Sequence, residues 1–306
     1  MKKEVIKTEI RKAYGNIAKS ESTPGGCCGT DADCCGSENT VSMAEEYSAV
    51  NGYVKEADMS LGCGLPTEIA NINLGDTVVD LGSGAGNDVF IARSIVGDTG
   101  KVIGLDMTPE MVIKALQNNQ KLGYTNVEFI LGEIENMNSI SSSTADVVIS
   151  NCVMNLVPDK EKAFKEVHRI LKTGGHFSIS DIVHVGTLPD GLLEAAEMYS
   201  GCVAGASEKG AYLGIIKQAG FKSIQIKKER KIELPDDLLL KYISVEELNL
   251  YKQTNAGLYS LTVYADKLEE GDCCETTEGG CCSTAESKSD EVVSSCCGSG
   301  SGSGCC

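Results

Sequence analysis

The chain has 306 residues, 42% of them hydrophobic, which is enough for one full-sized core and smaller appended regions. Its formal net charge of −17 disfavours nucleic acid or an anionic membrane surface as a principal partner, because binding to phosphates depends on Lys and Arg. The composition therefore favours a globular protein with a small-molecule site.

The N-terminal residues 1–20 are charged throughout and carry apolar residues at helical spacing, which predicts an amphipathic helix. No run of about eighteen apolar residues occurs, and no apolar segment of a secretion signal is visible. These features predict a cytoplasmic protein with reduced thiols. Residues 21–40 are rich in Gly, Ser and Asp and carry two cysteine pairs, which predicts a loop.

Strands and helices then alternate in short, regular units. The expected strands are residues 77–82, 101–106, 127–132, 145–150 and 176–183, and the expected helices are 87–96, 109–122 and 160–171, with a turn at 172–175. This alternation is typical of consecutive βαβ units. We therefore expect an α/β fold with a doubly wound, Rossmann-like parallel sheet.

The later part of the chain is expected to add a smaller α+β region. Residues 189–219 are expected to be largely helical, 222–232 a strand, 236–253 a helix and 257–267 a last strand. After Leu268 the chain contains mostly Gly, Ser, Thr, Glu and Cys, with little apolar surface to offset ordering entropy. This tail is predicted to be disordered when metal-free.

A glycine-rich stretch, VVDLGSGAGND at residues 78–88, lies between an expected strand and an expected helix. Its glycines let the backbone turn sharply and approach a ligand closely: Gly82, Gly84 and Gly86. Asp80 precedes these glycines, and Asp106 ends the next strand, where it is placed to accept hydrogen bonds from ribose hydroxyls. These features predict a site for a nucleotide-like cofactor.

The acidic residue at the start of the following helix, Asp88, bears on which cofactor binds. A dinucleotide-binding loop more usually reads G-x-G-x-x-G and seats a pyrophosphate, which Asp88 would repel. A cationic or zwitterionic ligand suits the acid better. The pattern resembles the S-adenosylmethionine-dependent methyltransferases, whose ligand has an amino group and a sulfonium but no phosphate. The alternatives are a dinucleotide loop and a βα turn that binds nothing.

The methyltransferase resemblance implies a set of cofactor-binding residues. From the methionine end to the adenine they are Asp80, Gly82, Ser83, Gly84, Asp88, Asp106, Met107, Ile134 and Glu135. Glu133 competes with Glu135 for the adenine. Asn151, which closes the fourth strand, lies where the methyl group should be presented, because ligands bind at the carboxyl ends of parallel strands.

Fifteen cysteines are present, of which twelve form six adjacent pairs and three stand alone: Cys63, Cys152 and Cys202. Cys152 directly follows Asn151, where an acceptor would be held. The other two are flanked by glycine or alanine, in LGCGLP and GCVAGA, where a small hydrophobe has little to pack against. A ligand-binding role and a buried structural role are both open, since free cysteine is commonly buried.

Several segments together resemble the arsenite methyltransferase family over residues 13–219: YGNIA, LGCGLP, DLGSGAGND, GLDMTPEM, VISNCVMNLVPDK and GCVAGA. The resemblance implies S-adenosylmethionine as methyl donor, As(III) as substrate and a role in arsenic detoxification. It also implies that Cys152 and Cys202 hold the arsenic. This agrees with the preference of soft centres for thiolates. The arsenic lone pair would then be the nucleophile, so that no general base is needed.

In the family, the third ligand or relay thiol corresponds to Cys63, and a cysteine of the N-terminal loop pairs with it. Cys35 is the expected partner because it is nearest in spacing, with Cys27, Cys28 and Cys34 as alternatives. Methyl transfer formally oxidises arsenic, and a dithiol that becomes a disulfide returns it to the trivalent state. A thioredoxin- or glutathione-type reductant would then regenerate the dithiol.

Two other functions stay open at this point. The first is C- or O-methylation of a quinone-like small molecule, which predicts that Cys152 and Cys202 tolerate serine. The second is a metalloid-binding buffer protein in which the cysteine pairs carry the function. The four C-terminal pairs are expected either to capture As(III) for delivery or to bind soft metals nonspecifically. The three histidines lie in or beside expected elements and are assigned structural roles.

The expected organisation follows from these assignments. Residues 1–60 hold the N-terminal helix and the cysteine-pair loop, and 61–220 form the S-adenosylmethionine-binding domain with the arsenic-binding cysteines. Residues 221–268 form a C-terminal α+β region, and 269–306 form the disordered cysteine-rich tail.

Overall fold

The computed structural model describes residues 2–19, 46–189, 191–192, 203 and 205–268. The expected cysteine-pair loop at 21–40, Cys202 and the tail at 269–306 lie outside the described residues. Residues 1–268 group as one unit by their contacts.

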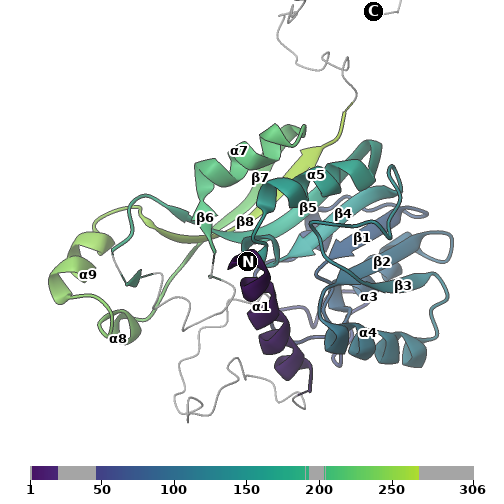
Figure 1. Ribbon diagram of the computed structural model, residues 1–306, viewed down its shortest axis with the longest axis horizontal. Helices are drawn as coiled ribbons and strands as arrows, with labels where there is room; N and C mark the ends of the chain where they lie inside the picture. Colours follow the sequence, from purple (N-terminus) through teal and green to yellow (C-terminus); the bar gives the residue numbers. More distant parts are fainter. Residues whose placement is uncertain (1, 20–45, 190, 193–202, 204, 269–306) are drawn as a thin grey trace, which may run out of the picture. The chain divides into compact units, whose positions relative to one another are not determined.

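The strands form one sheet in the order β3-β2-β1-β4-β5-β8-β7, with β6 paired to β5 (Figure 1). Their bounds are β1 Thr77–Leu81, β2 Lys101–Asp106, β3 Val127–Leu131, β4 Ala145–Asn151, β5 Leu171–Val185, β6 Ser207–Glu208, β7 Lys222–Ile232 and β8 Gly257–Asp266. Strands β1 to β5 pair in parallel, whereas β8 is antiparallel to β5 and to β7. The predicted α/β doubly wound fold is confirmed.

The helices have the following bounds: α1 Lys2–Lys19, α2 Pro66–Ile69, α3 Asn87–Val96, α4 Pro109–Leu122, the 3₁₀ turn η1 Met154–Leu156, α5 Lys160–Ile170, α7 Lys209–Gln218, α8 Asp236–Leu239 and α9 Val245–Lys252. The predicted helices at 87–96 and 109–122 are confirmed at both ends. Pro109 begins α4 and Gly123 ends it in a left-handed conformation. Within the described residues, none of these helices has the length and apolarity needed to cross a membrane.

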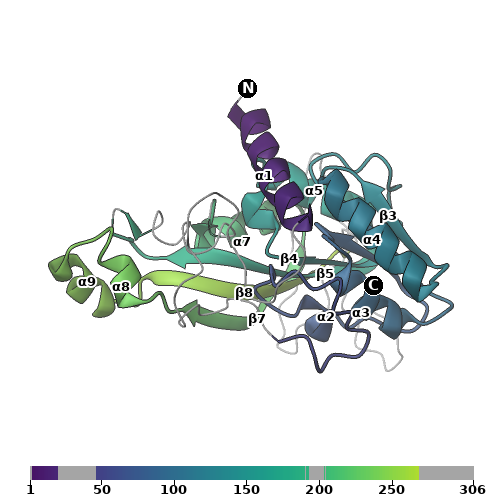
Figure 2. The same cartoon turned by 90° about the horizontal axis from the view of Figure 1, so that it is seen from below.

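Both faces of the central sheet are covered, as its mostly buried β1 and β4 require. On one face, Val79 packs in a cluster with Phe164 of α5 and Tyr212 of α7. On the other face, Val78 packs with residues of α3, including Phe90. In Figures 1 and 2, α8 and α9 lie at the opposite end of β5, β7 and β8 from α3 and α4.

Three expectations about the secondary structure are wrong in detail. The turn expected at 172–175 lies inside β5, where the pairing with β4 shifts between Ala145 and Val147, so these residues form an irregularity within a strand. The helix expected over 236–253 is two helices, because Ser244 begins α9 with a capping box closed by Glu247. The mainly helical stretch expected at 189–219 includes β6 in its described part.

Candidate active site

The sheet reverses its strand order at β1, which pairs with β2 on one side and β4 on the other. Ligands of open α/β sheets bind beyond the carboxyl ends of the strands at such a point. A cavity of about 150 Å³ lies there. Its lining includes all ten predicted cofactor-binding residues: Asp80, Gly82, Ser83, Gly84, Asp88, Asp106, Met107, Ile134, Glu135 and Asn151. The structure thus brings them together, and their individual roles toward a ligand stay predictions.

Backbone hydrogen bonds join the glycine-rich loop to the end of β2. The amides of Gly82 and Ser83 both donate to the carbonyl of Leu105, at 2.7 and 3.0 Å. Gly82 has a φ of +71°, and a Cβ there would lie 2.5 Å from a methyl carbon of Val153. The loop therefore requires glycine at this position for both its conformation and its packing.

Asp106 ties the loop to the cavity. One carboxylate oxygen accepts from the amide of Gly84 at 2.9 Å and the other from the amide of Thr108 at 2.8 Å. A carboxylate has about four lone-pair sites, so Asp106 keeps capacity for a hydroxyl donor. Burial raises the pKa of Asp106, and the two amide hydrogen bonds oppose that effect.

Two further carboxyl groups are buried in the cavity wall. Burial raises the pKa of Asp80 well above its usual value, and the charges of Asp88 and Asp106 raise it further. Burial also raises the pKa of Asp88 to about 6, against hydrogen bonds from Asn151 and Tyr47 that lower it. A cationic ligand would stabilise the ionised form of both acids. The cavity is therefore suited to positive charge.

Cys152 lies at the cavity and Cys63 directly behind it. Cys152 lines the cavity, has a left-handed φ of +59°, and donates its amide to the carbonyl of Ser180 at 2.8 Å. In place of the reduced thiols and the Cys63–Cys35 pairing expected from the sequence, a disulfide joins Cys152 to Cys63, with the two Cα atoms 5.7 Å apart. Both cysteines are almost fully buried. A left-handed conformation at a non-glycine residue is a form of strain that is concentrated at functional sites.

The other predicted cysteines cannot be placed beside this pair. Cys202 and the expected partner Cys35, with its alternatives, lie outside the described residues. Val203, which follows Cys202 in the chain, is buried in the same apolar cluster as Cys63 and Cys152. Within the part of the chain that the structure describes, no group of three or more His, Cys, Asp or Glu side chains could hold a metal ion.

The side chain of Asn151 fixes the loop that carries Cys63. Its Oδ1 accepts from the amides of Cys63 at 3.0 Å and Gly64 at 3.3 Å, and its Nδ2 donates to the carbonyl of Gly64 at 2.8 Å. A Cβ at Gly62 would lie 2.6 Å from this Nδ2, so the contact requires glycine. Gly62 of LGCGLP thus allows Asn151 to approach the loop backbone.

Sequence reasoning missed Tyr47, which comes before the predicted sheet and carries no recognisable motif. Its buried hydroxyl lies 3.0 Å from the carbonyl of Gly64 and 3.2 Å from Oδ2 of Asp88, and it accepts a hydrogen bond from Asn151. Burial raises its pKa, and the charge of Asp88 raises it further. The phenol therefore stays protonated and available as a donor.

Helix α1 covers one side of the cavity, a position that the sequence did not predict. Lys7, Ile10 and Tyr14 of this helix line the cavity. Lys7 forms ion pairs with Glu133 at 2.7 Å and with Glu135 at 2.6 Å. The only signal for this docking is that basic residues recur on α1 at intervals of four, at positions 3, 7 and 11.

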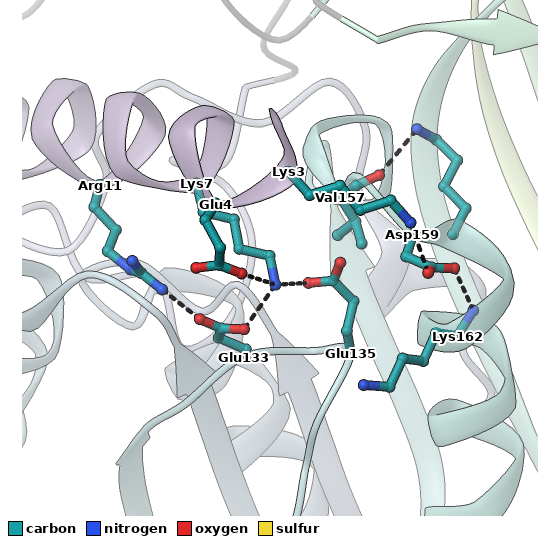
Figure 3. A network of polar contacts seen from close by, with 10 residues as sticks. Lys3, Glu4, Lys7, Arg11, Glu133, Glu135, Val157, Asp159 and Lys162 are labelled. Carbon is teal, nitrogen blue, oxygen red and sulfur yellow. Dashed lines mark hydrogen bonds and ion pairs between the residues drawn. The ribbon is translucent and has the colours of Figure 1, made fainter. Parts of the chain in front are cut away.

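Figure 3 shows the side chains of Lys3, Lys7 and Arg11 pointing from α1 toward Glu133, Glu135 and Asp159. Arg11 adds a second ion pair to Glu133, and Lys3 pairs with Asp159 at 2.8 Å. Burial lowers the pKa of Lys7, but its bonds to the two glutamates outweigh that effect and leave the pKa raised. Lys7 therefore neutralises two adjacent acids at the predicted adenine end of the cavity.

Comparison with known proteins places this site in a family. A model described as a methyltransferase domain matches residues 72–220. Arsenite methyltransferase from Halobacterium salinarum is 41% identical over 221 residues, which cover 72% of this chain and 56% of that protein. Arsenite methyltransferase from Mus musculus is 34% identical, with 66% and 54% covered. The chain thus spans a little over half the length of these curated relatives.

A solved structure gives the same result. The crystal structure of an arsenic(III) S-adenosylmethionine methyltransferase from Chlamydomonas reinhardtii is 33% identical, with a TM-score of 0.58 and 68% of each chain covered. The strand order and these matches show the fold of an S-adenosylmethionine-dependent methyltransferase. The chain belongs to the arsenite methyltransferase family. The resemblance inferred from the sequence motifs is confirmed.

The residues at the cavity fit the methyl donor of this class. S-adenosylmethionine carries an ammonium and a sulfonium group, and the cavity offers buried carboxyls. Oδ2 of Asp88 is hydrogen-bonded to Tyr47 and Asn151, whereas its buried Oδ1 has no hydrogen-bond partner among the described residues. Leaving such an acceptor unpaired is costly, and a cationic ligand would satisfy it.

The ionised side chain of Asp88 should lower folding stability and strengthen the binding of a cationic ligand. Because its pKa is higher in the folded state, its ionisation reduces stability as pH rises from about 4 through about 6. At pH values above about 6, we expect Asp88→Asn to raise the free energy of unfolding by about 2–3 kcal/mol. We also expect this substitution to weaken S-adenosylhomocysteine binding at least about tenfold. Guanidinium denaturation at pH 5 and 8, with calorimetry, measures both. The exposed Asp237→Asn is the control, and a less stable Asp88→Asn at pH 8 would contradict this account.

Lys7 should hold α1 on the cavity. Replacing it by Met leaves Glu133 and Glu135 without the ammonium that lies between them, and removing one partner of a buried ion pair is strongly destabilising. We expect Lys7→Met to lower the hydrogen-exchange protection of α1 and to weaken S-adenosylhomocysteine binding about tenfold. Lys12→Met, on an exposed position of the same helix, should change neither. Equal effects of the two substitutions would refute this role of Lys7.

Proposed function

We propose that this chain transfers the methyl group of S-adenosylmethionine to As(III) held by cysteine thiolates. The observation that most supports this proposal is that Cys152 lines the same cavity as the glycine loop and the buried carboxyls. The sulfur of Cys152, which is in a disulfide with Cys63 here, would become a thiolate at the donor site after reduction. Membership of the arsenite methyltransferase family supports the same reaction.

The donor would be held by groups whose chemistry matches its parts. Asp88, with Asp80 behind it, would bind the ammonium end, Asp106 and Met107 would contact the ribose and adenine, and Ile134 with Glu135 would hold the adenine. When bound, S-adenosylmethionine supplies an electrophilic methyl group on a sulfonium. The chain's contribution is to orient that group toward Cys152 and to exclude water, because positioning alone accounts for much of such a barrier.

The substrate would be held by soft ligands. Thiolates of Cys152 and Cys202 would displace oxygen ligands of arsenite, and Cys63 would act as third ligand or relay thiol. Val203 packs in the cluster that contains Cys63 and Cys152, and its covalent neighbour is Cys202, which supports this assignment. Because the arsenic lone pair is the nucleophile, the reaction needs no base.

The electron balance requires a reductant. When arsenic gains the methyl group, the carbon–sulfur bond of the donor breaks with its electron pair going to sulfur, and arsenic is formally oxidised by two electrons. A dithiol of Cys63 with Cys35, or with Cys152 as in the disulfide observed here, would return those electrons. A thioredoxin- or glutathione-type thiol would reduce that disulfide, which places arsenic detoxification in a reducing compartment such as the cytoplasm.

Arsenic speciation tests the proposal directly. The purified chain, incubated with S-adenosylmethionine, arsenite and glutathione, should form methylated arsenic. Cys152→Ser and Cys202→Ser should each lower the rate by about two orders of magnitude or more, because serine is a poor ligand for a soft centre. S-adenosylhomocysteine binding should persist in both variants. Chromatography coupled to arsenic-specific mass spectrometry measures the products.

Cys296→Ser, in the C-terminal tail, is the matched control and should retain activity. No methylated arsenic under reducing conditions would overturn the proposal. Full activity of Cys152→Ser and Cys202→Ser toward another acceptor, such as a quinone, would favour a carbon or oxygen methyltransferase instead. Tight As(III) binding without turnover would favour a metalloid-binding protein.

A further inference from the structure

The donor cavity and the loop that carries Cys63, residues 62–64, share one set of hydrogen bonds. Nδ2 of Asn151 has two protons but lies within bonding distance of three acceptors. These are the carbonyl of Gly64 at 2.8 Å, Oδ2 of Asp88 at 3.2 Å, and the hydroxyl of Tyr47. The amide therefore divides its protons between the loop and the cavity.

Tyr47 shows the same competition more sharply. Its hydroxyl has a single proton and two acceptors within reach: the carbonyl of Gly64 in the loop, and Oδ2 of Asp88 in the cavity. The phenol is buried, with 5% of the residue exposed, so water offers little alternative. Whatever changes the strength of Asp88 as an acceptor must therefore change the bond that Tyr47 makes to the loop.

We propose that Tyr47 is a positioning residue that couples occupancy of the donor site to the order of the Cys63 loop. Its proton is shared between the cavity acid and the loop carbonyl. The proposal rests on the donor site of the proposed function but does not depend on arsenic as the acceptor.

The direction of the coupling follows from charge. An ionised carboxylate is a stronger acceptor than a carbonyl, so Asp88 competes well for the proton while its charge is uncompensated. A cationic group bound at the free Oδ1 of Asp88 weakens that competition, and the phenol proton then serves the carbonyl of Gly64. Donor binding thus stabilises the loop, and an ordered loop must by linkage strengthen donor binding by the same factor.

Two cysteines report separately on the two halves of this coupling. Cys152 lines the cavity, so a bound ligand covers it directly. Cys63 is not among the lining residues and is 1% exposed, so a reagent reaches it only when the loop opens. Protection of Cys152 therefore measures occupancy of the cavity, and protection of Cys63 measures order of the loop.

The experiment compares the reduced full-length chain with its Tyr47→Phe variant. Each is alkylated with N-ethylmaleimide, with and without saturating S-adenosylhomocysteine, and the rate at each cysteine is read by peptide mass spectrometry. In the unaltered chain the ligand should slow alkylation of both Cys63 and Cys152, at Cys63 by about tenfold, within the usual range of coupling energies. In Tyr47→Phe, Cys152 should stay protected while protection of Cys63 falls to within about twofold of none.

The matched control is Tyr259→Phe, which removes a phenol donating to the carbonyl of Asn255 at 2.8 Å, outside the cavity lining. It should behave like the unaltered chain. The proposal is overturned if the ligand does not protect Cys63 in the unaltered chain, or if Tyr47→Phe keeps that protection. If Tyr47→Phe binds the ligand too weakly to be saturated, Tyr47 belongs to the donor site itself, and the proposal is also overturned. Arsenic is absent throughout, so failure of the proposed function would not alter these outcomes.

Discussion

The hydrogen bonds of one side-chain amide, that of Asn151, hold the site together. They connect the end of β4 to the loop at 62–64, across 88 and 87 positions of sequence. Parallel pairing of β4 with β1 brings the same side chain within 3.2 Å of Asp88. A half-buried primary amide whose carbonyl and amino groups are both hydrogen-bonded fixes its neighbours closely, because any displacement leaves a polar group unpaired. The geometry of the cavity and of the loop that carries Cys63 depends on Asn151.

Charge is treated differently at the two ends of the cavity. At the predicted adenine end, Lys7 and Arg11 compensate Glu133, and the pKa of that acid falls, chiefly through its hydrogen bond with Lys7. At the other end, burial keeps the pKa of Asp80 and Asp88 raised. The chain thus neutralises its own acids where an uncharged ring would bind, and leaves acids to be neutralised by a cationic ligand elsewhere. Such preorganised charge costs folding stability and favours a specific ligand.

The sequence predicted those elements whose first and last residues are determined by neighbouring residues in the chain. Helix α3 follows the glycine-rich loop and ends at Gly97, so its bounds needed no tertiary information. The turn expected at 172–175 failed because Gly174 and Gly175 instead pair with Lys267, which lies far along the chain. The same limit applies to the site. The glycine-loop residues are contiguous and were found, whereas Tyr47 contacts Asp88 across 41 positions, a pairing that no local pattern encodes.

Cys152 lies on the boundary between two environments. On one side is the acidic cavity, and on the other is an apolar cluster to which α8 and α9 contribute Leu239 and Leu248. A positively charged methyl donor is stabilised by carboxylates, whereas a soft, weakly hydrated metalloid is held by sulfur among apolar side chains. In the proposed reaction, the thiolate of Cys152 at this boundary holds the arsenic nucleophile on the apolar side. The cationic donor stays on the acidic side, so each reactant keeps the environment that stabilises it. In this proposal the C-terminal region contributes by making the cysteine side of the site apolar.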